Sequence, residues 1–168
     1  MATTVASEPE AASSVLLPEL VPAGSAVFVD TNVLIYASFP ELPLAQVART
    51  RLNELKDADL SFWASRQVLR EFLATATRPG TLKASSPVKE IVGSVRTWEK
   101  QLTIADEDAQ VTQHLLAFLE NPGARGKQVH DANIAATMRR YAIPYLLTHN
   151  TADFARYAPW VTVLPLIP

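Results

Sequence analysis

The chain of 168 residues contains no cysteine. It therefore forms no disulfide, has no thiol nucleophile and cannot hold zinc through sulfur, and it fits a reducing compartment. No apolar run reaches the roughly 20 residues that a membrane-spanning helix needs. The N-terminus also lacks a basic region followed by a continuous apolar stretch, so it does not resemble a secretory signal. These absences favour a cytoplasmic protein without a membrane partner.

Basic residues are missing from the first 24 positions, which carry three acids and no lysine or arginine. This stretch is rich in Ala, Ser, Pro and Glu, and we expect residues 1–24 to be an N-terminal tail or peripheral segment. Its apolar residues, 15–17 and 20–21, could still pack on the domain. The remaining residues, 25–168, are expected to form a single domain with a proper core.

Short apolar runs alternate with helical periodicity along the rest of the chain. We expect strands at 26–29, 60–63, 102–104, 145–148 and 160–164. We expect helices at 32–38, 44–56, 65–77, 87–100, 106–121, 130–141 and 152–157. Ser65 is a good N-cap for the third of these helices. Strands that alternate with helices predict an α/β fold, in which a parallel sheet has helices on both faces.

The first expected strand ends abruptly at Asp30, and a second apolar run begins after Thr31 and Asn32. This pattern indicates a buried strand that delivers a carboxylate to the end of a parallel sheet and then leads into a helix. Open α/β sheets bind ligands in the crevice beyond such strand ends.

Two further carboxylates lie on predicted helices. Asp131 falls in the middle of an apolar helix face, where a carboxylate is costly unless it is paired or binds a metal. Its simpler interpretation is an N-terminal aspartate favoured by the helix dipole. Glu71 lies just outside the core stripe of its helix, and its simpler interpretation is an exposed helical glutamate.

Residues 146–154 repeat the pattern of an apolar strand that runs through polar residues into a helix. Thr148 and Asn150 would lie near Asp30 if the two strands are neighbours. Capping offers another explanation, with Thr151 as N-cap and Asp153 in the first turn.

Carboxylates that converge without matching Lys or Arg would repel one another, and a hard divalent cation removes that repulsion. Mg²⁺ and Mn²⁺ take oxygen ligands. A metal-bound water has a lowered pKa and can attack a phosphodiester, while the metal stabilises charge on the phosphate oxygens. The ordered set of acids therefore predicts metal-dependent phosphodiester chemistry.

At this point the chain, from about residue 26 to 168, resembles the PIN-domain ribonucleases and, among them, the VapC-like toxins of type II toxin–antitoxin systems. The segments that carry the resemblance are Val29-Asp30-Thr31-Asn32, Val68-Leu69-Arg70-Glu71-Phe72, Val129-His130-Asp131-Ala132-Asn133-Ile134-Ala135-Ala136 and Leu147-Thr148-His149-Asn150-Thr151-Ala152-Asp153-Phe154. The resemblance implies a PIN-like three-layer α/β/α sandwich with about five parallel strands. It also implies a Mg²⁺- or Mn²⁺-dependent endoribonuclease that forms a homodimer and is neutralised by a cognate antitoxin.

Asp30, Glu71 and Asp131 match the three acidic, catalytic metal ligands of that family. Many relatives place a fourth acid where this chain has Asn150, whereas others keep the later aspartate, here Asp153. Either residue is therefore a candidate fourth ligand. The resemblance gives Asn32 and Thr148 the role of polar supports.

The basic residues provide candidate contacts to RNA. If Asp30, Glu71, Asp131 and Asp153 surround a metal, the rest of residues 25–168 has 15 basic residues against 10 acidic ones, which suits a phosphate-bearing partner. The candidates are Arg66, Arg70, Arg78, Lys83, Arg125, Lys127, Arg139 and Arg140, although each could simply belong to a solvated helix face. The loop with Arg125 and Lys127 has the best case because it leads into the Asp131 helix. We expect the RNA to be unpaired, because sequence-specific readers usually need splayed bases.

Two other functions fit parts of this pattern. Haloacid-dehalogenase-type phosphatases also begin with an aspartate after a strand, but they need a second aspartate where this chain has Asn32. The chain also lacks the Gly-Asp pair that would come later in that family. The other alternative is a non-catalytic PIN-like module that binds RNA or a protein, and Asn150 leaves this alternative open.

Overall fold

The computed structural model describes residues 21–82, 86–120 and 124–167. A five-stranded sheet forms its centre, with the strand order β3-β2-β1-β4-β5. The strands are β1 (Ala26–Val29), β2 (Ser61–Ser65), β3 (Thr103–Ala105), β4 (Tyr145–Thr148) and β5 (Thr162–Pro165). Every neighbouring pair is parallel. The predicted parallel α/β sheet is therefore confirmed.

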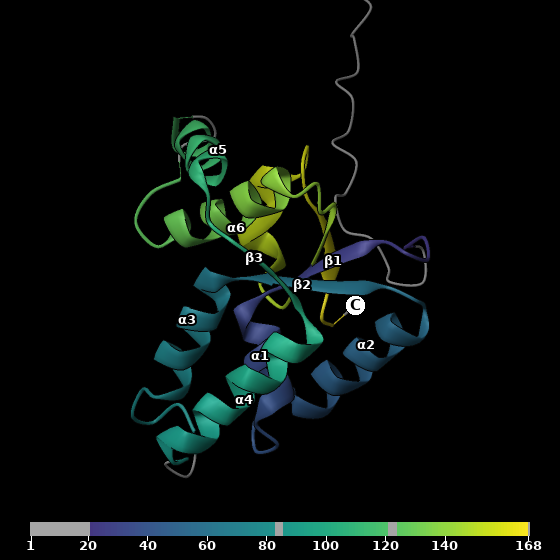
Figure 1. Cartoon of the computed structure of the whole chain (residues 1–168), viewed down its shortest axis with the longest axis vertical. Coiled ribbons are helices and arrows are strands. Elements are labelled where there is room, and N and C mark those ends of the chain that lie inside the picture. Colours follow the sequence, from purple (N-terminus) through teal and green to yellow (C-terminus); the bar gives the residue numbers. More distant parts are fainter. Residues whose placement is uncertain (1–20, 83–85, 121–123, 168) are drawn as a thin grey trace, which may run out of the picture.

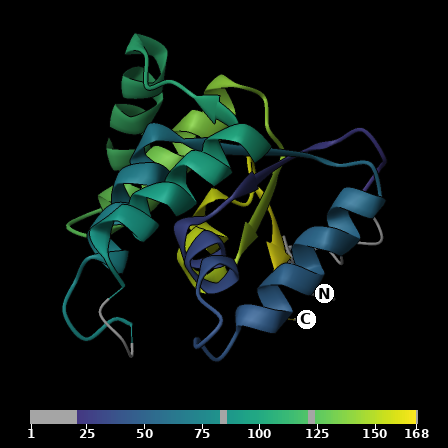
Figure 2. The same ribbon diagram turned by 60° about the horizontal axis from the view of Figure 1, so that its bottom comes forward.

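Helices cover both faces of this sheet, as Figures 1 and 2 show. They are α1 (Thr31–Ser38), α2 (Ala45–Asp57), α3 (Arg66–Ala76), α4 (Val88–Gln101), α5 (Ala109–Glu120), α6 (Gln128–Arg140) and the 3₁₀ helix η2 (Thr151–Tyr157). Helices α1 to α4 lie on one side, and α5 and α6 lie on the other (Figure 1). Within the described ranges, no helix has the length and apolar character needed to cross a bilayer.

The two central strands carry the core. The side chains of residues 27–29 of β1 and residues 146–148 of β4 are fully buried. Strands of a parallel sheet are covered on both faces, so they are near-continuously apolar rather than alternating. This explains why short apolar runs, and not an alternating pattern, marked these strands in the sequence.

The order of the strands determines where the polar strand ends meet. From β1 the chain continues to β2 on one side, whereas β4 joins β1 on the other side, so the direction of strand addition reverses between β1 and β4. Val29 pairs with Leu147, and the Asp30 backbone N–H donates to the Leu147 carbonyl at 3.0 Å. Ligand crevices in open α/β folds occur at such switch points, beyond the carboxyl ends of the strands.

The predicted boundaries differ from the structure in a few informative places. Strand β2 extends to Ser65, which also caps α3 as predicted, because its hydroxyl accepts from the Val68 N–H at 3.3 Å. The prediction of Thr151 as an N-cap was wrong. Thr151 is the first residue of η2, and Asn150 precedes it without a capping hydrogen bond from its side chain. Side-chain capping therefore does not explain the polar residues of this turn.

Candidate functional site

Asp30 is fixed at the end of β1 by three short hydrogen bonds. Its Oδ1 accepts from the Thr31 backbone N–H at 2.6 Å. Its Oδ2 accepts from Asn32 Nδ2 at 2.6 Å and from the Thr148 hydroxyl at 2.6 Å. The side chain is only 6% exposed, so both its position and its rotamer are determined by its neighbours.

The same polar residues join the turn after β1 to the turn after β4. Asn32 Oδ1 accepts from the His149 N–H at 3.0 Å, and its Nδ2 lies 3.2 Å from Thr148 Oγ1. The Thr148 oxygen also accepts from the Asn150 N–H at 3.0 Å. Asn32 and Thr148, predicted as supports, thus hold Asp30 and the Asn150 backbone in one rigid unit.

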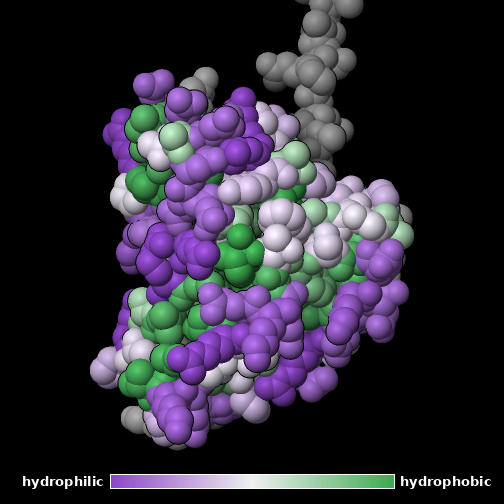
Figure 3. Space-filling view, viewed as in Figure 1, coloured by the Kyte–Doolittle hydropathy of each residue, from purple (hydrophilic) through white to green (hydrophobic). Residues whose placement is uncertain are grey.

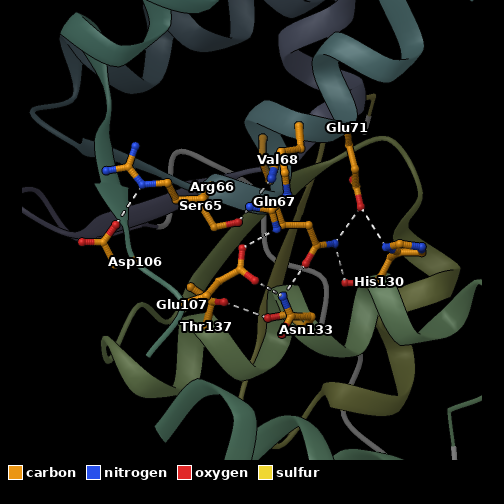
Figure 4. A network of polar contacts seen from close by, with 11 residues as sticks. Ser65, Arg66, Gln67, Val68, Glu71, Asp106, Glu107, His130, Asn133 and Thr137 are labelled. Carbon is orange, nitrogen blue, oxygen red and sulfur yellow. Dashed lines mark hydrogen bonds and ion pairs between the residues drawn. The ribbon is translucent and has the colours of Figure 1, made fainter. Parts of the chain in front are cut away.

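Glu71 reaches this unit from α3. Its Oε2 accepts from the Thr31 hydroxyl at 2.9 Å, and its Oε1 accepts from Gln67 Nε2 at 2.7 Å. His130 Nδ1 lies 3.2 Å from the same Oε1 (Figure 4). Because Thr31 donates to Asp30 through its backbone and to Glu71 through its side chain, it links the two carboxylates.

Gln67 connects α3 to α6 beneath Glu71, as Figure 4 shows. Besides Glu71, the buried Gln67 amide donates to the His130 carbonyl at 3.0 Å and accepts from Asn133 Nδ2 at 2.5 Å. Asn133 also lies 3.5 Å from Glu107, which pairs with Arg70 at 2.9 Å. This network aligns the two helices that carry Glu71 and Asp131.

Most of the predicted site residues line one groove of about 690 Å³, which we call the acidic groove. It is lined by Asp30, Thr31, Asn32, Ile35, Tyr36, Leu42, Glu71, Ala74, Thr75, Arg78, Thr81, Lys127, His130, Asp131, Ile134 and Asn150. Thr148 lies buried beside Asp30. Asp153 and Arg125 are exposed and do not line it.

The groove raises the pKa of two of its carboxyl groups. Burial raises the pKa of Asp30 to about 6, and the charge of Glu71 adds to this, whereas hydrogen bonds from Thr148, Thr31 and Asn32 oppose it. Burial also raises the pKa of Asp131 to about 6, followed by the charges of Asp153, Asp30 and Glu71. Asp153 thus acts on Asp131 from outside the groove lining, whereas Asn150 lies within the lining. Both candidates for the fourth position remain.

The donor set of the groove fits a hard divalent cation. In the parts of the chain that the structure describes, no three His, Asp or Glu side chains are grouped closely enough to form an assembled metal site. The carboxylates nevertheless retain lone pairs that could bind a cation, since each carboxylate oxygen has two lone pairs. Asp30 Oδ1 and Glu71 Oε2 each accept one hydrogen bond. Among the lining residues, the groups that can bind a metal are oxygen donors and one imidazole, which suits Mg²⁺ or Mn²⁺ rather than a softer metal.

The candidate RNA-binding cations divide into two groups. Arg78 and Lys127 line the acidic groove, and Arg125 is exposed in the same loop as Lys127. Four others have partners outside it: Arg66 pairs with Asp106, Arg70 with Glu107 and Arg140 with Asp108, while Arg139 stacks on Phe118 and Trp160. Lys83 lies outside the described residues.

Sequence reasoning missed three residues of the site: Thr31, Gln67 and His130. Gln67 had a usable signal, because residues four apart on a helix face each other and Gln67 precedes Glu71 by four. Thr31 and His130 each lie next to a predicted acid. Their contacts to Glu71 join segments about 40 and 60 residues apart, which no local pattern reveals.

Comparison with known proteins identifies the family and the fold. Residues 27–158 match the family described as PIN domain. A search of curated proteins gave no match. Among solved structures, VapBC2 from Rickettsia felis, bound to a promoter DNA fragment, has a TM-score of 0.61 and 20% identity, covering 83% of this chain and 98% of that one.

Two further structures are similar over comparable lengths. VapC20 of Mycobacterium tuberculosis, described as a sarcin-ricin loop cleaving toxin, has a TM-score of 0.62 and 16% identity, covering 83% of this chain and 99% of that one. VapBC-1 from nontypeable Haemophilus influenzae has a TM-score of 0.62 and 18% identity, covering 85% and 99%. At these identities the likeness shows the shared fold.

Proposed function

Because the chain belongs to the PIN-domain family, we propose that it is a metal-dependent endoribonuclease that hydrolyses RNA phosphodiester bonds in the acidic groove. One observation carries the proposal. Asp30, Glu71 and Asp131 come from a strand end and two helices that are far apart in sequence, yet they line the same groove as Arg78 and Lys127. Carboxylates suit the metal of metal-assisted phosphodiester hydrolysis, and cations beside them suit a phosphate-bearing substrate.

Asp30, Glu71 and Asp131 would hold the Mg²⁺ or Mn²⁺ ion, with Asn150 or Asp153 in the fourth position. When bound, the cation would supply positive charge that stabilises the negative charge on the phosphate oxygens. Asn32, Thr31 and Thr148 hold the Asp30 carboxylate in place and oppose the rise of its pKa. The chain thereby keeps a buried carboxylate ionised near neutral pH.

Lys127 and Arg78, which line the same groove, would bind the phosphates of an unpaired RNA strand. Tyr36 also lines the groove and offers an aromatic face on which a base could stack.

The decisive experiment is cleavage of single-stranded RNA with Mg²⁺ or Mn²⁺, with EDTA as the metal-free control. Asp30→Asn and Asp131→Asn should each abolish cleavage while the circular dichroism spectrum stays native. Asp57→Asn is the matched control, because Asp57 is exposed at the end of α2 and should leave cleavage unchanged. Equal cleavage by the wild type and Asp30→Asn would refute the assignment.

The fourth position needs its own pair of variants. Asn150→Ala tests the residue that lines the groove, and Asp153→Ala tests the one that raises the pKa of Asp131. The variant that loses metal-dependent cleavage without unfolding identifies the ligand. A small change in both would mean that three carboxylates suffice.

We further propose that this nuclease is the toxin of a toxin–antitoxin pair and a homodimer. The support for an antitoxin partner comes from its structural neighbours, which include a toxin–antitoxin complex from Klebsiella pneumoniae. The homodimer rests on the resemblance to VapC-like toxins. A small upstream reading frame that overlaps this gene would support the toxin–antitoxin pair if it encodes a protein with a DNA-binding N-terminal part and an apolar C-terminal tail. The absence of such a frame would leave a stand-alone nuclease.

The second candidate is a non-catalytic module that binds RNA. The neutral Asn150 in the groove and the absence of an assembled metal group among the described residues favour it. It predicts RNA binding that is independent of Mg²⁺ and produces no cleavage, so the same assay separates the two.

A further inference from the structure

A second hollow of about 690 Å³ lies away from the acidic groove, between α2 and α4. We call it the α2–α4 groove. It is lined by Ala37, Arg49, Leu52, Asn53, Lys56, Leu60, Ser61, Phe62, Trp98, Lys100, Gln101, Leu102 and Thr103. These include the first residues of β2 and β3, whereas the acidic groove follows the carboxyl end of β1. The two grooves share no lining residue.

The α2–α4 groove carries positive charge without a balancing acid. Arg49, Lys56 and Lys100 line it, and no Asp or Glu does. In the described segments, none of these three cations forms a salt bridge; the pairs found involve other residues. Arg49 Nε donates to the Ala37 carbonyl at 2.8 Å, which fixes its guanidinium at the groove. The groove therefore suits an acidic partner.

The interior of this groove is apolar. Leu52, Leu60 and Leu102 lie at its base with little exposure, and the half-buried rings of Phe62 and Trp98 complete the lining. Figure 3 shows hydrophobic surface between two hydrophilic ridges, over the part of the molecule where Figure 1 labels α4 and α2. An occupant should therefore combine acidic side chains with apolar ones.

The chain enters the domain beside this groove. The Gly24 N–H donates to the Asp59 carbonyl at 2.9 Å, and the Ser61 N–H donates to the Ser25 carbonyl at 3.0 Å. The segment that precedes β1 therefore runs next to Leu60 and Ser61, which line the groove. Twenty residues precede the described part of the chain.

Those residues have the composition that the groove requires. They contain Glu8, Glu10 and Glu19 and no lysine or arginine. Apolar residues 15–17 and Leu20 lie between and beside the acids. Residues 8–20 span up to about 45 Å when extended, at roughly 3.5 Å per residue, so they are long enough to cover the groove.

We propose that residues 8–20 of this chain dock into its own α2–α4 groove, with glutamates near Arg49, Lys56 and Lys100 and leucines over the apolar base. This assignment concerns a surface away from the acidic groove and does not depend on nuclease activity. It implies that a partner protein that uses this groove must first displace the N-terminal segment.

A spin label on the N-terminal segment tests the proposal in the full chain. The protein has no native cysteine, so Ser14→Cys provides a single labelling site. In ¹H–¹⁵N spectra, the amides of Leu60, Phe62 and Lys100 should lose intensity and regain it when the nitroxide is reduced. Amides of α5 and α6, on the other side of the sheet, should keep their intensity (Figure 1).

Charge variants sharpen this test. Lys56→Glu with Lys100→Glu should restore the groove signals, whereas the matched control Lys89→Glu with Arg96→Glu, exposed on α4 outside the groove, should not. Neutralising the segment instead, with Glu8→Gln, Glu10→Gln and Glu19→Gln, gives the same loss of docking without touching the domain. Raising the salt from 0.1 M to 1 M, which shortens the Debye length from about 10 Å to about 3 Å, should weaken the effect.

Three results would overturn the proposal. The groove amides could keep their intensity, all surfaces could lose it equally, or the loss could survive both sets of charge variants. Mixing ¹⁵N-labelled protein that has no spin label with unlabelled, spin-labelled protein gives the last check. Intensity loss at the groove in this mixture would assign it to a second copy instead.

Discussion

At the scale of single residues, the acidic groove is defined by what it does to Asp30 and Asp131. The side chain of an aspartate ordinarily has a pKa of 3.8, and both groups reach about 6 because burial and neighbouring carboxylates disfavour their ionised forms. Both are therefore mostly ionised at pH 7 and mostly neutral at pH 5. Between pH 5 and pH 7, protons and a metal cation would therefore compete for the carboxylate oxygens of Asp30 and Asp131.

The first prediction is that Mn²⁺ affinity falls steeply from pH 7 to pH 5. Each carboxylate that must lose a proton costs about a factor of ten over this range, because one pKa unit corresponds to 1.36 kcal/mol. Isothermal titration calorimetry at both pH values measures this. Asp57→Asn should behave as the wild type does, and an affinity that does not change with pH would contradict the roles of Asp30 and Asp131.

The second prediction concerns Thr148, whose hydroxyl lowers the pKa of Asp30. Thr148→Val removes that donor, so the pKa of Asp30 should rise further and the acid limb of the cleavage pH profile should move up by about one pH unit. A hydrogen bond to a charged group is worth about 1.5–3 kcal/mol, which sets this magnitude. Thr137→Val is the control, since Thr137 is also buried but donates to the Asn133 carbonyl. An unchanged profile in Thr148→Val would refute the coupling.

The third prediction uses a buried hydroxyl that has no partner. Tyr157 is fully buried, and its OH makes no hydrogen bond with the described residues. Burying an unpaired polar group costs about 1–3 kcal/mol. Tyr157→Phe should therefore raise the free energy of unfolding by about 1 kcal/mol, as measured by urea denaturation. A loss of stability would show that the hydroxyl has a partner, such as a buried water.

At the scale of elements, two helices on opposite faces of the sheet supply Glu71 and Asp131. The Ser65 cap sets where α3 begins, and Gln67 holds α3 to α6 through the His130 carbonyl and Asn133. The position of each acid thus depends on a contact between helices rather than on its own helix alone.

The fourth prediction is that Gln67→Leu weakens metal binding in the acidic groove through its contact with Glu71. The substitution leaves Asn133, Glu71 and the His130 carbonyl each without one hydrogen bond, so the unfolding free energy should fall by about 1–3 kcal/mol. Mn²⁺ affinity should also fall, because Glu71 loses the donor that orients it. Gln113→Leu, exposed on α5, is the control for the loss of an amide. If Gln67→Leu lost stability but kept full Mn²⁺ affinity, Gln67 would be structural only.

At the scale of the whole molecule, a net charge of −2 conceals two surfaces of opposite character. The acidic groove combines carboxylates with Arg78 and Lys127, and the α2–α4 groove has cations alone. Because exposed charges are screened within about 8–10 Å at physiological salt, each groove attracts partners through its local charge rather than through the net charge.

The fifth prediction is that Arg78→Ala with Lys127→Ala raises the KM for RNA several-fold and changes kcat little. Each lost phosphate contact should reduce the salt dependence of binding by about 0.7 in log–log slope, or about 1.4 for both. Fluorescence anisotropy at several salt concentrations measures this slope. Lys89→Ala with Arg96→Ala is the control, and an unchanged slope would place the RNA elsewhere.

Much of this arrangement could be predicted from local pattern. The strand that ends at Asp30, the Ser65 cap and the apolar face around Asp131 all follow from hydrophobic periodicity and side-chain chemistry. The role of Thr151 could not be predicted in this way, because the turn places Asn150, whose N–H donates to Thr148, before η2 and makes Thr151 its first residue. The choice between Asn150 and Asp153 is likewise undecided by pattern, because it depends on how a turn packs against α6.

The sequence by itself determined the α/β class, the positions of the elements and the acids that end or interrupt apolar runs. These properties are local, because they depend on residues within a few positions of one another. Only the tertiary structure decided that β4 lies beside β1, that Thr31 and Gln67 fix Glu71, and that two cations face the carboxylates while others are paired elsewhere. These outcomes depend on contacts between segments about 40 to 120 residues apart, and packing of the whole core selects them.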